Sequence, residues 1–134
     1  MVAVADNTHL HLLEFADRKA LPAELSRLQK AAGGIGFGTT EPLDRTKAEL
    51  TDYFDGQRAT FTVPLALHGT TFTKSVWQAL MAVRAGQIQT YAGLAQKIGR
   101  PTATRAVARA NGANQISILI PCHRVIGADG NLTG

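Results

Sequence analysis

A single cysteine, Cys122, among 134 residues restricts how this chain can fold. One cysteine can form neither an internal disulfide nor a multi-cysteine zinc site. The fold must therefore be held by hydrophobic burial, for which a chain of this length with 45% hydrophobic residues has enough material. A chain without disulfides is also typical of a reducing compartment, so we expect an intracellular protein.

The residues around Cys122 predict a reactive thiol on a turn. The apolar run over residues 116–120 predicts a buried strand, and Pro121 predicts a sharp turn where that strand ends, because proline fixes φ and lacks a ladder donor. A lone cysteine is most often a small buried hydrophobe. Here His123 and Arg124 follow directly, and adjacent positive charge favours the thiolate, which is the nucleophilic form.

Charge is divided unevenly between the two halves of the chain. Residues 1–67 carry seven Lys or Arg and nine Asp or Glu, a net charge of −2, whereas residues 68–134 carry seven Lys or Arg and one acid, a net charge of +6. This asymmetry predicts that the second half meets a polyanion, with nucleic acid as the leading candidate. The alternative is a solvated basic face.

No stretch of the sequence has the pattern of a membrane span or a leader. A span needs about 18 consecutive apolar residues. Residues 1–6 place no basic region before an apolar stretch. We therefore expect a cytoplasmic protein that does not associate with membranes.

The first half of the chain carries the patterns of both strands and helices. Alternation of polar and apolar residues from residue 9, with a slip after residue 12, predicts a strand with a bulge. Leucines at positions 21, 25 and 28 predict one helix, with Pro22 in its first turn, and a second helix is predicted from near Leu43 to Phe54. The segment over residues 61–67 alternates again, and Pro64 restricts it to an edge or a linker.

Two patterns in this half suggest chemistry that their context does not support. His9 and His11 would share one face of a strand, but they lack an acidic or cysteine partner at a usual spacing, so we predict no metal site. The glycine-rich segment over residues 33–38 lacks the Lys-Ser/Thr that completes a phosphate loop, so we predict a connector. The charge shift, Pro64 and Gly69 place a domain boundary between residues 63 and 69.

From residue 70 onward the apolar residues follow helical spacing. Thr70 or Thr71 can cap a first helix and Thr90 a second, and a third helix is predicted to begin at Pro101 and Thr102. The second and third helices are joined by residues 99–101 and together predict a helix-turn-helix. By itself this pattern is a weak indication of DNA binding.

The third helix has two different faces. Its predicted core face holds Ala103, Ala106, Val107 and Ala110, and its outer face holds Arg105, Ala108, Arg109 and Gly112. Small residues between arginines allow the helix backbone to lie close to another surface. A nucleophilic thiol beside a DNA-reading helix is what chemistry on a DNA base requires, because the base must be rotated out of the duplex first.

Residues 118–126, Ile-Leu-Ile-Pro-Cys-His-Arg-Val-Ile, resemble the active-site signature of the O6-alkylguanine-DNA alkyltransferases, also called methylated-DNA-protein-cysteine methyltransferases. The resemblance covers residues 65–134. It implies an α+β fold with a small RNase H-like sheet-plus-helix domain over residues 1–64 and a winged-helix-like domain with a helix-turn-helix over residues 65–134. The match extends through Phe72-Thr73, Val76-Trp77, Thr90-Tyr91, Leu94-Ala95, Arg105-Ala106-Val107 and Asn111 to Asn114.

The resemblance also implies a reaction. Cys122 would take the alkyl group from O6-alkylguanine, and also from O4-alkylthymine, irreversibly and once per molecule, without a cofactor. His123 would accept the thiol proton through a water, and Tyr91 would hydrogen-bond the guanine and help it leave as a neutral base. Asn114 would fix the turn that carries the thiol.

Double-stranded DNA, approached from the minor groove with the damaged base flipped out, is the partner that the resemblance implies. Arg105 would fill the space that the base vacates, and Thr73 would contact a phosphate. The protein would act as a monomer, associated with the nucleoid when bound, or in the nucleus of a eukaryote. The remaining contacts would come from Ala108, Arg109 and Gly112 toward the groove, and from Pro121, Val125 and the Cys122 carbonyl in the guanine pocket.

The sequence departs from the family pattern at its end. It stops at Gly134, 12 residues after Cys122, whereas the family continues through a glycine-containing loop and a final helix with a glutamate that orients the histidine. We therefore expect a shortened form of a longer protein. Two alternatives remain: a non-catalytic protein that binds alkylated DNA, and a thiol hydrolase.

Overall fold

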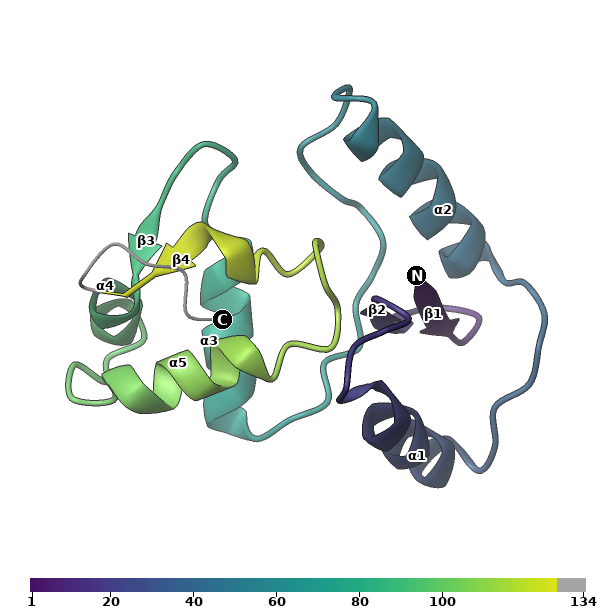
Figure 1. Ribbon diagram of the computed structural model, residues 1–134, viewed down its shortest axis with the longest axis horizontal. Helices are drawn as coiled ribbons and strands as arrows, with labels where there is room; N and C mark the ends of the chain where they lie inside the picture. Colours follow the sequence, from purple (N-terminus) through teal and green to yellow (C-terminus); the bar gives the residue numbers. More distant parts are fainter. Residues whose placement is uncertain (128–134) are drawn as a thin grey trace. The chain divides into compact units, whose positions relative to one another are not determined.

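The computed structural model describes residues 1–127, which fall into two compact units that divide between Ala66 and Leu67. The mixture of short strands and helices confirms the predicted α+β class (Figure 1). Unit 1 contains β1 (Val2–Ala5), β2 (Leu10–Glu14), α1 (Leu21–Ala32) and α2 (Glu41–Phe54). Unit 2 contains α3 (Thr71–Met81), β3 (Gln89–Thr90), α4 (Tyr91–Lys97), α5 (Thr104–Gly112), the 3-10 turn η1 (Cys122–Arg124) and β4 (Val125–Ile126).

An antiparallel hairpin of β1 and β2 forms the centre of unit 1. Its register pairs Val4 with Leu12 and Ala5 with Leu10, so His11 is the extra residue of a bulge in β2. The slip in the alternating pattern is therefore present. Strand β1 was not predicted from the sequence, because four short apolar residues at a chain start carry little periodicity.

Strand β2 is buried along almost its whole length, because helices cover both faces of the hairpin. Leu12 packs against Leu21 and Leu28 of α1, while α2 contacts both strands. Figure 1 shows α1 and α2 on opposite sides of the hairpin. In a strand that is covered on both faces, consecutive residues are buried instead of every second one. Residues 12–14 are all buried, in agreement with this.

The outer edge of β2 is paired by the segment that leads out of unit 1. The backbone N–H of Leu10 donates to the carbonyl of Pro64 at 2.8 Å, and the N–H of Ala66 donates to the carbonyl of Leu10 at 2.8 Å. Pro64 thus supplies only an acceptor, which is all that a proline can supply to a ladder. Its position at the edge agrees with the restriction expected from the sequence.

Unit 1 buries a charged cluster beside α1. Glu14 and Glu24 are 0% and 2% exposed, and Arg18 Nη1 lies 2.9 Å from Glu14 Oε2. Burial, together with the neighbouring Glu14 carboxyl group, raises the pKa of Glu24 to about 7 against the opposing charges of Arg18 and Arg27. Because Glu14 and Glu24 share Arg18 in a buried site, the pair is more stable with one negative charge than with two negative charges.

The stability of unit 1 should therefore depend on the protonation of Glu24. Because its pKa is higher in the folded chain than the ordinary 4.5, the stabilisation is fully present below that value and is lost as the pH rises through about 7. We expect the free energy of unfolding of unit 1 to fall by about 1 kcal/mol between about pH 6 and about pH 8. Urea unfolding followed by circular dichroism measures this, while the single tryptophan, Trp77, reports unit 2 by fluorescence.

Glu24→Gln imitates the protonated side chain and should remove this part of the pH dependence. Glu41→Gln is the matched control, because Glu41 also lies in the first turn of a helix but its side chain is 60% exposed. Equal pH dependence in the wild type and in Glu24→Gln would contradict the assignment.

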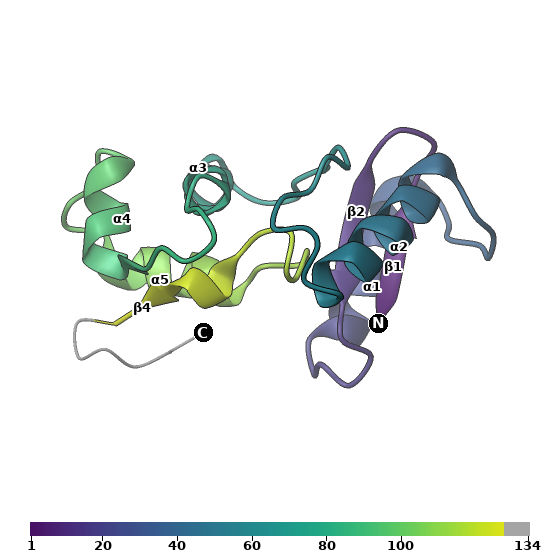
Figure 2. The same cartoon turned by 90° about the horizontal axis from the view of Figure 1, so that it is seen from above.

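Helices α3, α4 and α5 of unit 2 pack on one another (Figures 1 and 2). Thr70 caps α3 as expected, with its Oγ1 accepting from the N–H of Thr73 at 3.1 Å. The buried face of α3 is Val76, Trp77 and Leu80. The indole N–H of Trp77 donates to the carbonyl of Ala110 at 2.9 Å, which ties α3 to α5.

Helices α4 and α5 form the predicted helix-turn-helix. Thr90 caps α4, and Gly99 adopts φ 76° in the turn, a conformation that favours glycine. The expected start of α5 at Pro101 and Thr102 is wrong. The N–H of Ala103 donates to the carbonyl of Arg100 at 2.9 Å, so a separate turn precedes the helix, which begins at Thr104.

The two faces of α5 differ in part from those expected. Arg105, Arg109 and Gly112 are exposed, as predicted, and Ala108 is half-buried. The predicted core face was wrong at Ala103 and Ala106, which are only partly buried. Val107 and Ala110 face inward as predicted, and Asn111 is buried with them, so a polar side chain also occupies the buried face.

Candidate active site

The segment before the cysteine is a series of tight turns, so the predicted strand over residues 116–120 is wrong. The N–H of Ile120 donates to the carbonyl of Ile116 at 3.1 Å, and that of Leu119 to the carbonyl of Ser117 at 2.8 Å. Ile118 adopts φ 73°, a strained value for a β-branched residue. Ile116, Leu119 and Ile120 are buried as expected and Ile118 is only partly buried, and the backbone N–H groups of Leu119 and Ile120 are paired within the loop itself.

Asn114 holds this loop closed. Its side chain is 1% exposed; Oδ1 accepts from the N–H of Ile116 at 2.9 Å, and Nδ2 donates to the carbonyl of Ile120 at 2.8 Å. One amide therefore satisfies a buried donor and a buried acceptor on the two ends of the loop. The carbonyl of Ile120 also accepts from the N–H of Cys122 at 2.8 Å, which connects Asn114 to the cysteine.

Cys122 begins the 3-10 turn η1, directly after the bend at Pro121. The N–H of Arg124 donates to the carbonyl of Pro121 at 3.0 Å, so the proline starts the turn as the sequence indicated. Cys122 is half-buried, and Pro121 and Val125 on either side of the turn are buried. A thiol in this position is held by its backbone and is still reachable from outside.

The two basic residues after Cys122 have different environments. Arg124 Nη1 donates to the carbonyl of Val83 at 2.8 Å, just beyond the end of α3, which anchors the turn. His123 is the most exposed residue of η1. Partial burial lowers the pKa of His123 below its ordinary 6.5, and the charge of Arg124 lowers it further. The imidazole is therefore mainly neutral at pH 7 and can accept a proton.

Tyr91 and the cysteine turn both adjoin the small sheet of unit 2. Strands β3 and β4 run parallel, with Gln89 opposite Val125 and Thr90 opposite Ile126. Tyr91 follows the carboxyl end of β3, whereas Cys122 lies three residues before the amino end of β4, so strand pairing alone does not bring the two residues together. Tyr91 is 5% exposed.

Asn111 on α5 connects Tyr91 and Cys122, although its sequence context predicted no role for it. Its Nδ2 donates to the hydroxyl of Tyr91 at 3.3 Å and to the carbonyl of Cys122 at 3.4 Å. The available signal was weak: an asparagine on a predicted helix, one residue beyond the apolar face. Only the packing of α4 and α5 shows that it points inward.

The predicted DNA-contacting residues differ in exposure: Arg105, Arg109 and Gly112 are exposed, Thr73 and Ala108 are half-buried, and Tyr91 is buried. Neither Arg105 nor Arg109 takes part in an ion pair with any residue in the range 1–127, and both are exposed. Thr73 lies in the first turn of α3, where its Oγ1 accepts from the hydroxyl of Thr70 at 2.9 Å. The hydroxyl proton of Thr73 is therefore left to serve another acceptor.

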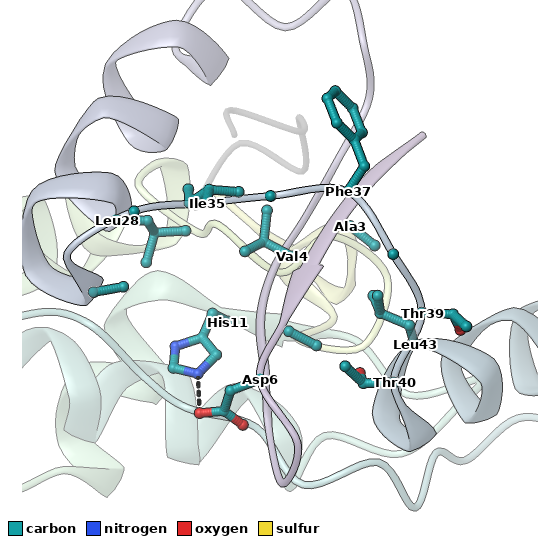
Figure 3. A pocket seen from close by; sticks show the side chains of 15 residues that line it. Ala3, Val4, Asp6, His11, Leu28, Ile35, Phe37, Thr39, Thr40 and Leu43 are labelled. Carbon is teal, nitrogen blue, oxygen red and sulfur yellow. Dashed lines mark hydrogen bonds and ion pairs between the residues drawn. The ribbon is translucent and has the colours of Figure 1, made fainter.

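A cavity of about 630 Å³ lies in unit 1, apart from all of these residues. Figure 3 shows it between the β1–β2 hairpin and the glycine-rich segment, with Val4, Ile35 and Leu43 lining it. The Asp6 carboxylate lies at its edge and binds His11 Nε2 at 2.8 Å; this contact and the backbone N–H groups of Thr8 and His9 hold the pKa of Asp6 well below its usual range. None of the predicted site residues lines it.

In the part of the chain that the structure describes, no helix combines the length and the apolar character needed to cross a membrane.

Two family models match the chain and together cover nearly all of it. The ribonuclease-like domain of 6-O-methylguanine DNA methyltransferase matches residues 2–67. The DNA binding domain of 6-O-methylguanine DNA methyltransferase matches residues 71–134.

Curated relatives carry the same kind of name. A methylated-DNA-protein-cysteine methyltransferase of Salmonella typhimurium is 55% identical over 87 residues, which are 64% of this chain and 51% of that protein. The constitutive enzyme of that name from Bacillus subtilis is 46% identical over 95 residues, 71% of this chain and 58% of that protein. The chain thus spans about half the length of the curated relatives it matches.

Solved structures resemble both units. The O6-methylguanine methyltransferase of Mycobacterium tuberculosis is 35% identical with a TM-score of 0.81, over 97% of this chain and 73% of that chain. A complex of the Mycobacterium tuberculosis protein with DNA gives a TM-score of 0.79, over 98% of this chain and 74% of that chain.

Proposed function

The chain belongs to the 6-O-methylguanine DNA methyltransferase family, and we propose that it repairs DNA by transferring the alkyl group of O6-alkylguanine irreversibly to its own Cys122. O4-alkylthymine is the proposed second substrate. The observation that carries the proposal is the half-buried Cys122 on its Pro-Cys-His-Arg turn. The side chain of Asn111 links the backbone carbonyl of Cys122 to the hydroxyl of Tyr91.

The proposed reaction is a direct displacement. The Cys122 thiol loses its proton through a water to the neutral imidazole of His123, and the resulting thiolate attacks the alkyl carbon. The carbon–sulfur bond forms as the carbon–O6 bond breaks, and the electron pair of that bond stays with the base. The Tyr91 hydroxyl passes its proton to the departing base, which leaves as neutral guanine, and the proton that His123 took from the thiol returns through water to the tyrosine oxygen. A thioether is not reversed, so each molecule acts once.

Specific backbone groups would hold the flipped base. The carbonyls of Cys122 and Val125 accept from the guanine amino group, and the buried Pro121 and Val125 form the wall of the pocket. A carbonyl oxygen has two lone pairs, so the Cys122 carbonyl can accept from the base and from Asn111 together.

The outer face of α5 is the proposed DNA surface. Exposed Arg105 would enter the stack and occupy the space of the missing base, and Arg109 would meet the phosphate backbone. Ala108 and Gly112 leave the helix backbone free to approach the minor groove. The first turn of α3 adds the hydroxyl of Thr73 as a phosphate donor.

We assign DNA binding and catalysis to residues 65–134 and a separate N-terminal domain to residues 1–64. The two compact units that divide after Ala66 support this assignment. The protein would act as a monomer, without a cofactor, on double-stranded DNA in the cytoplasm.

The proposal is tested with duplex DNA that carries radiolabelled O6-methylguanine. Label should move to the protein and saturate at one methyl group per molecule, and peptide mapping should place it on Cys122. Label that stays on tightly bound DNA would identify a non-catalytic lesion binder. Continuing turnover of an ester substrate would identify a thiol hydrolase.

Arg105→Ala should separate base flipping from chemistry. Without the guanidinium, nothing fills the vacated stack, and unstacking a base costs a few kcal/mol. We expect transfer from duplex DNA to slow by at least about tenfold, while the reaction with free O6-benzylguanine changes by less than about twofold. Single-turnover rates with both substrates measure this. Arg84→Ala, which removes an exposed arginine outside α5, is the control, and equal losses on both substrates would remove this role from Arg105.

A further inference from the structure

Asn111 is a buried polar residue that the proposed reaction does not yet use. It is 1% exposed on α5, and its Nδ2 reaches the Tyr91 hydroxyl and the Cys122 carbonyl at 3.3 Å and 3.4 Å. Its Oδ1 is buried without a hydrogen-bond partner among residues 1–127. The residue therefore contacts both the group that donates to the base and the backbone of the nucleophile.

The chemistry of the partners fixes the orientation of this amide. The Cys122 carbonyl can only accept, so the amide nitrogen of Asn111 must face it, and the oxygen in that place would repel it. The same nitrogen carries a second hydrogen for the Tyr91 oxygen. A phenol oxygen that accepts from Asn111 directs its own proton away from Asn111, so the hydrogen bond orients Tyr91 as a donor toward the side where the base would lie.

We propose that Asn111 is a positioning residue. It orients the Tyr91 hydroxyl as a donor to the flipped base, and it fixes the position of the Cys122 carbonyl relative to that hydroxyl. The inference rests on the proposed alkyl transfer. It goes beyond that proposal by naming what couples protonation of the leaving base to the nucleophile. Asn111 touches neither the thiol nor the alkyl group in this scheme and acts through Tyr91.

The unpaired Oδ1 argues against a purely structural role. A buried acceptor without a partner lowers stability, and an apolar side chain of similar volume would avoid that loss. The fold would therefore tolerate leucine at this position as well as asparagine. If the amide serves the reaction, its removal should slow the chemistry without unfolding the protein.

Asn111→Leu tests this directly. Transfer rates from O6-methylguanine duplex are measured against DNA concentration, which separates the limiting rate constant from the half-saturating concentration. We expect the limiting rate to fall by about tenfold or more, with half-saturation within about twofold and an unchanged or higher Tm by Trp77 fluorescence. Gln96→Leu, an exposed amide on α4 changed in the same way, is the matched control.

Asn111→Asp keeps the shape of the side chain but removes the donor. An ionised carboxylate at position 111 would accept a hydrogen bond from the Tyr91 hydroxyl and so turn that hydroxyl away from the base. The protonated acid would again donate a hydrogen bond to the Tyr91 oxygen. We expect a slow variant whose rate recovers as the pH falls, opposite in sign to the wild type, in which protonation of His123 removes the proton acceptor. A variant with the wild-type pH profile would overturn the inference.

A double-mutant cycle with Tyr91→Phe decides whether Asn111 acts through the hydroxyl. In the Tyr91→Phe background, Asn111→Leu should cause little further loss of rate, because the group that it positions is gone. Fully additive losses, or a wild-type rate in Asn111→Leu, would overturn the positioning role while the wild type still transfers label to Cys122. Failure of the wild type to transfer any label would instead overturn the proposed function and this inference with it.

Discussion

Cys122→Ala is expected to abolish alkyl transfer completely and to leave DNA binding close to that of the wild type. Cys122 is the only cysteine in the chain, so no other thiol can replace it, and serine or threonine hydroxyls are far weaker nucleophiles at pH 7. The side chain is half-buried at the start of η1, and the smaller alanine leaves the turn's backbone hydrogen bonds in place. Transfer of label and mass spectrometry of the intact chain measure the reaction, and fluorescence anisotropy with lesion-containing duplex measures the binding.

The comparison needs a variant that is impaired on duplex DNA but keeps the thiol, and Arg105→Ala serves as that control. If Cys122→Ala still acquired label from the DNA, the nucleophile would be misassigned. If it lost affinity for DNA as well, the thiol turn would contribute to docking, and the separation between the binding face of α5 and the reactive turn would be wrong.

Asn114→Ala is expected to destabilise unit 2 strongly and to slow transfer in the protein that remains folded. The substitution leaves the buried N–H of Ile116 without this acceptor and removes one of the two donors to the Ile120 carbonyl, which still accepts from the N–H of Cys122. An unpaired buried group costs about 1–3 kcal/mol and a lost hydrogen bond about 1 kcal/mol, so the free energy of unfolding should fall by about 2–4 kcal/mol. The strained φ of Ile118 should relax when the closing contact is lost.

Urea unfolding monitored by Trp77 fluorescence measures the stability of Asn114→Ala, and single-turnover transfer at a low temperature measures the rate. We expect the rate to fall by at least about tenfold, because the loop that carries Cys122 no longer has a single conformation. Gln115→Ala, one residue further along, is the control for truncation near the loop. A wild-type rate in folded Asn114→Ala would show that the loop does not need this side chain to present the thiol.

The parts of this protein that sequence reasoning predicted well are those that depend on near neighbours along the chain. Thr70 and Thr90 are followed by helices because a side-chain oxygen can accept from a backbone N–H three residues on. Pro22 marks the first turn of α1 for an equally local reason. The bend at Pro121 follows from the fixed φ of proline.

The errors lie where partners distant in sequence decide the structure. The apolar run before Pro121 has the composition of a buried strand, and periodicity cannot distinguish that from a buried loop. Asn114 and the turns of the loop itself supply the hydrogen bonds that a neighbouring strand would have supplied. The burial of Glu24 was equally unpredictable, because it depends on Arg18 and Glu14 meeting beside α1.

The sequence by itself determined the positions of the helices, the presence of one thiol between a proline and two basic residues, and a signature specific enough to indicate the family. These are properties of residue type and spacing, which persist in any conformation. Only the tertiary structure decided which side chains surround that thiol. The packing of α5 against α4 brings Asn111 to both Tyr91 and Cys122, which are 31 residues apart in sequence, and no local pattern encodes a contact of that range.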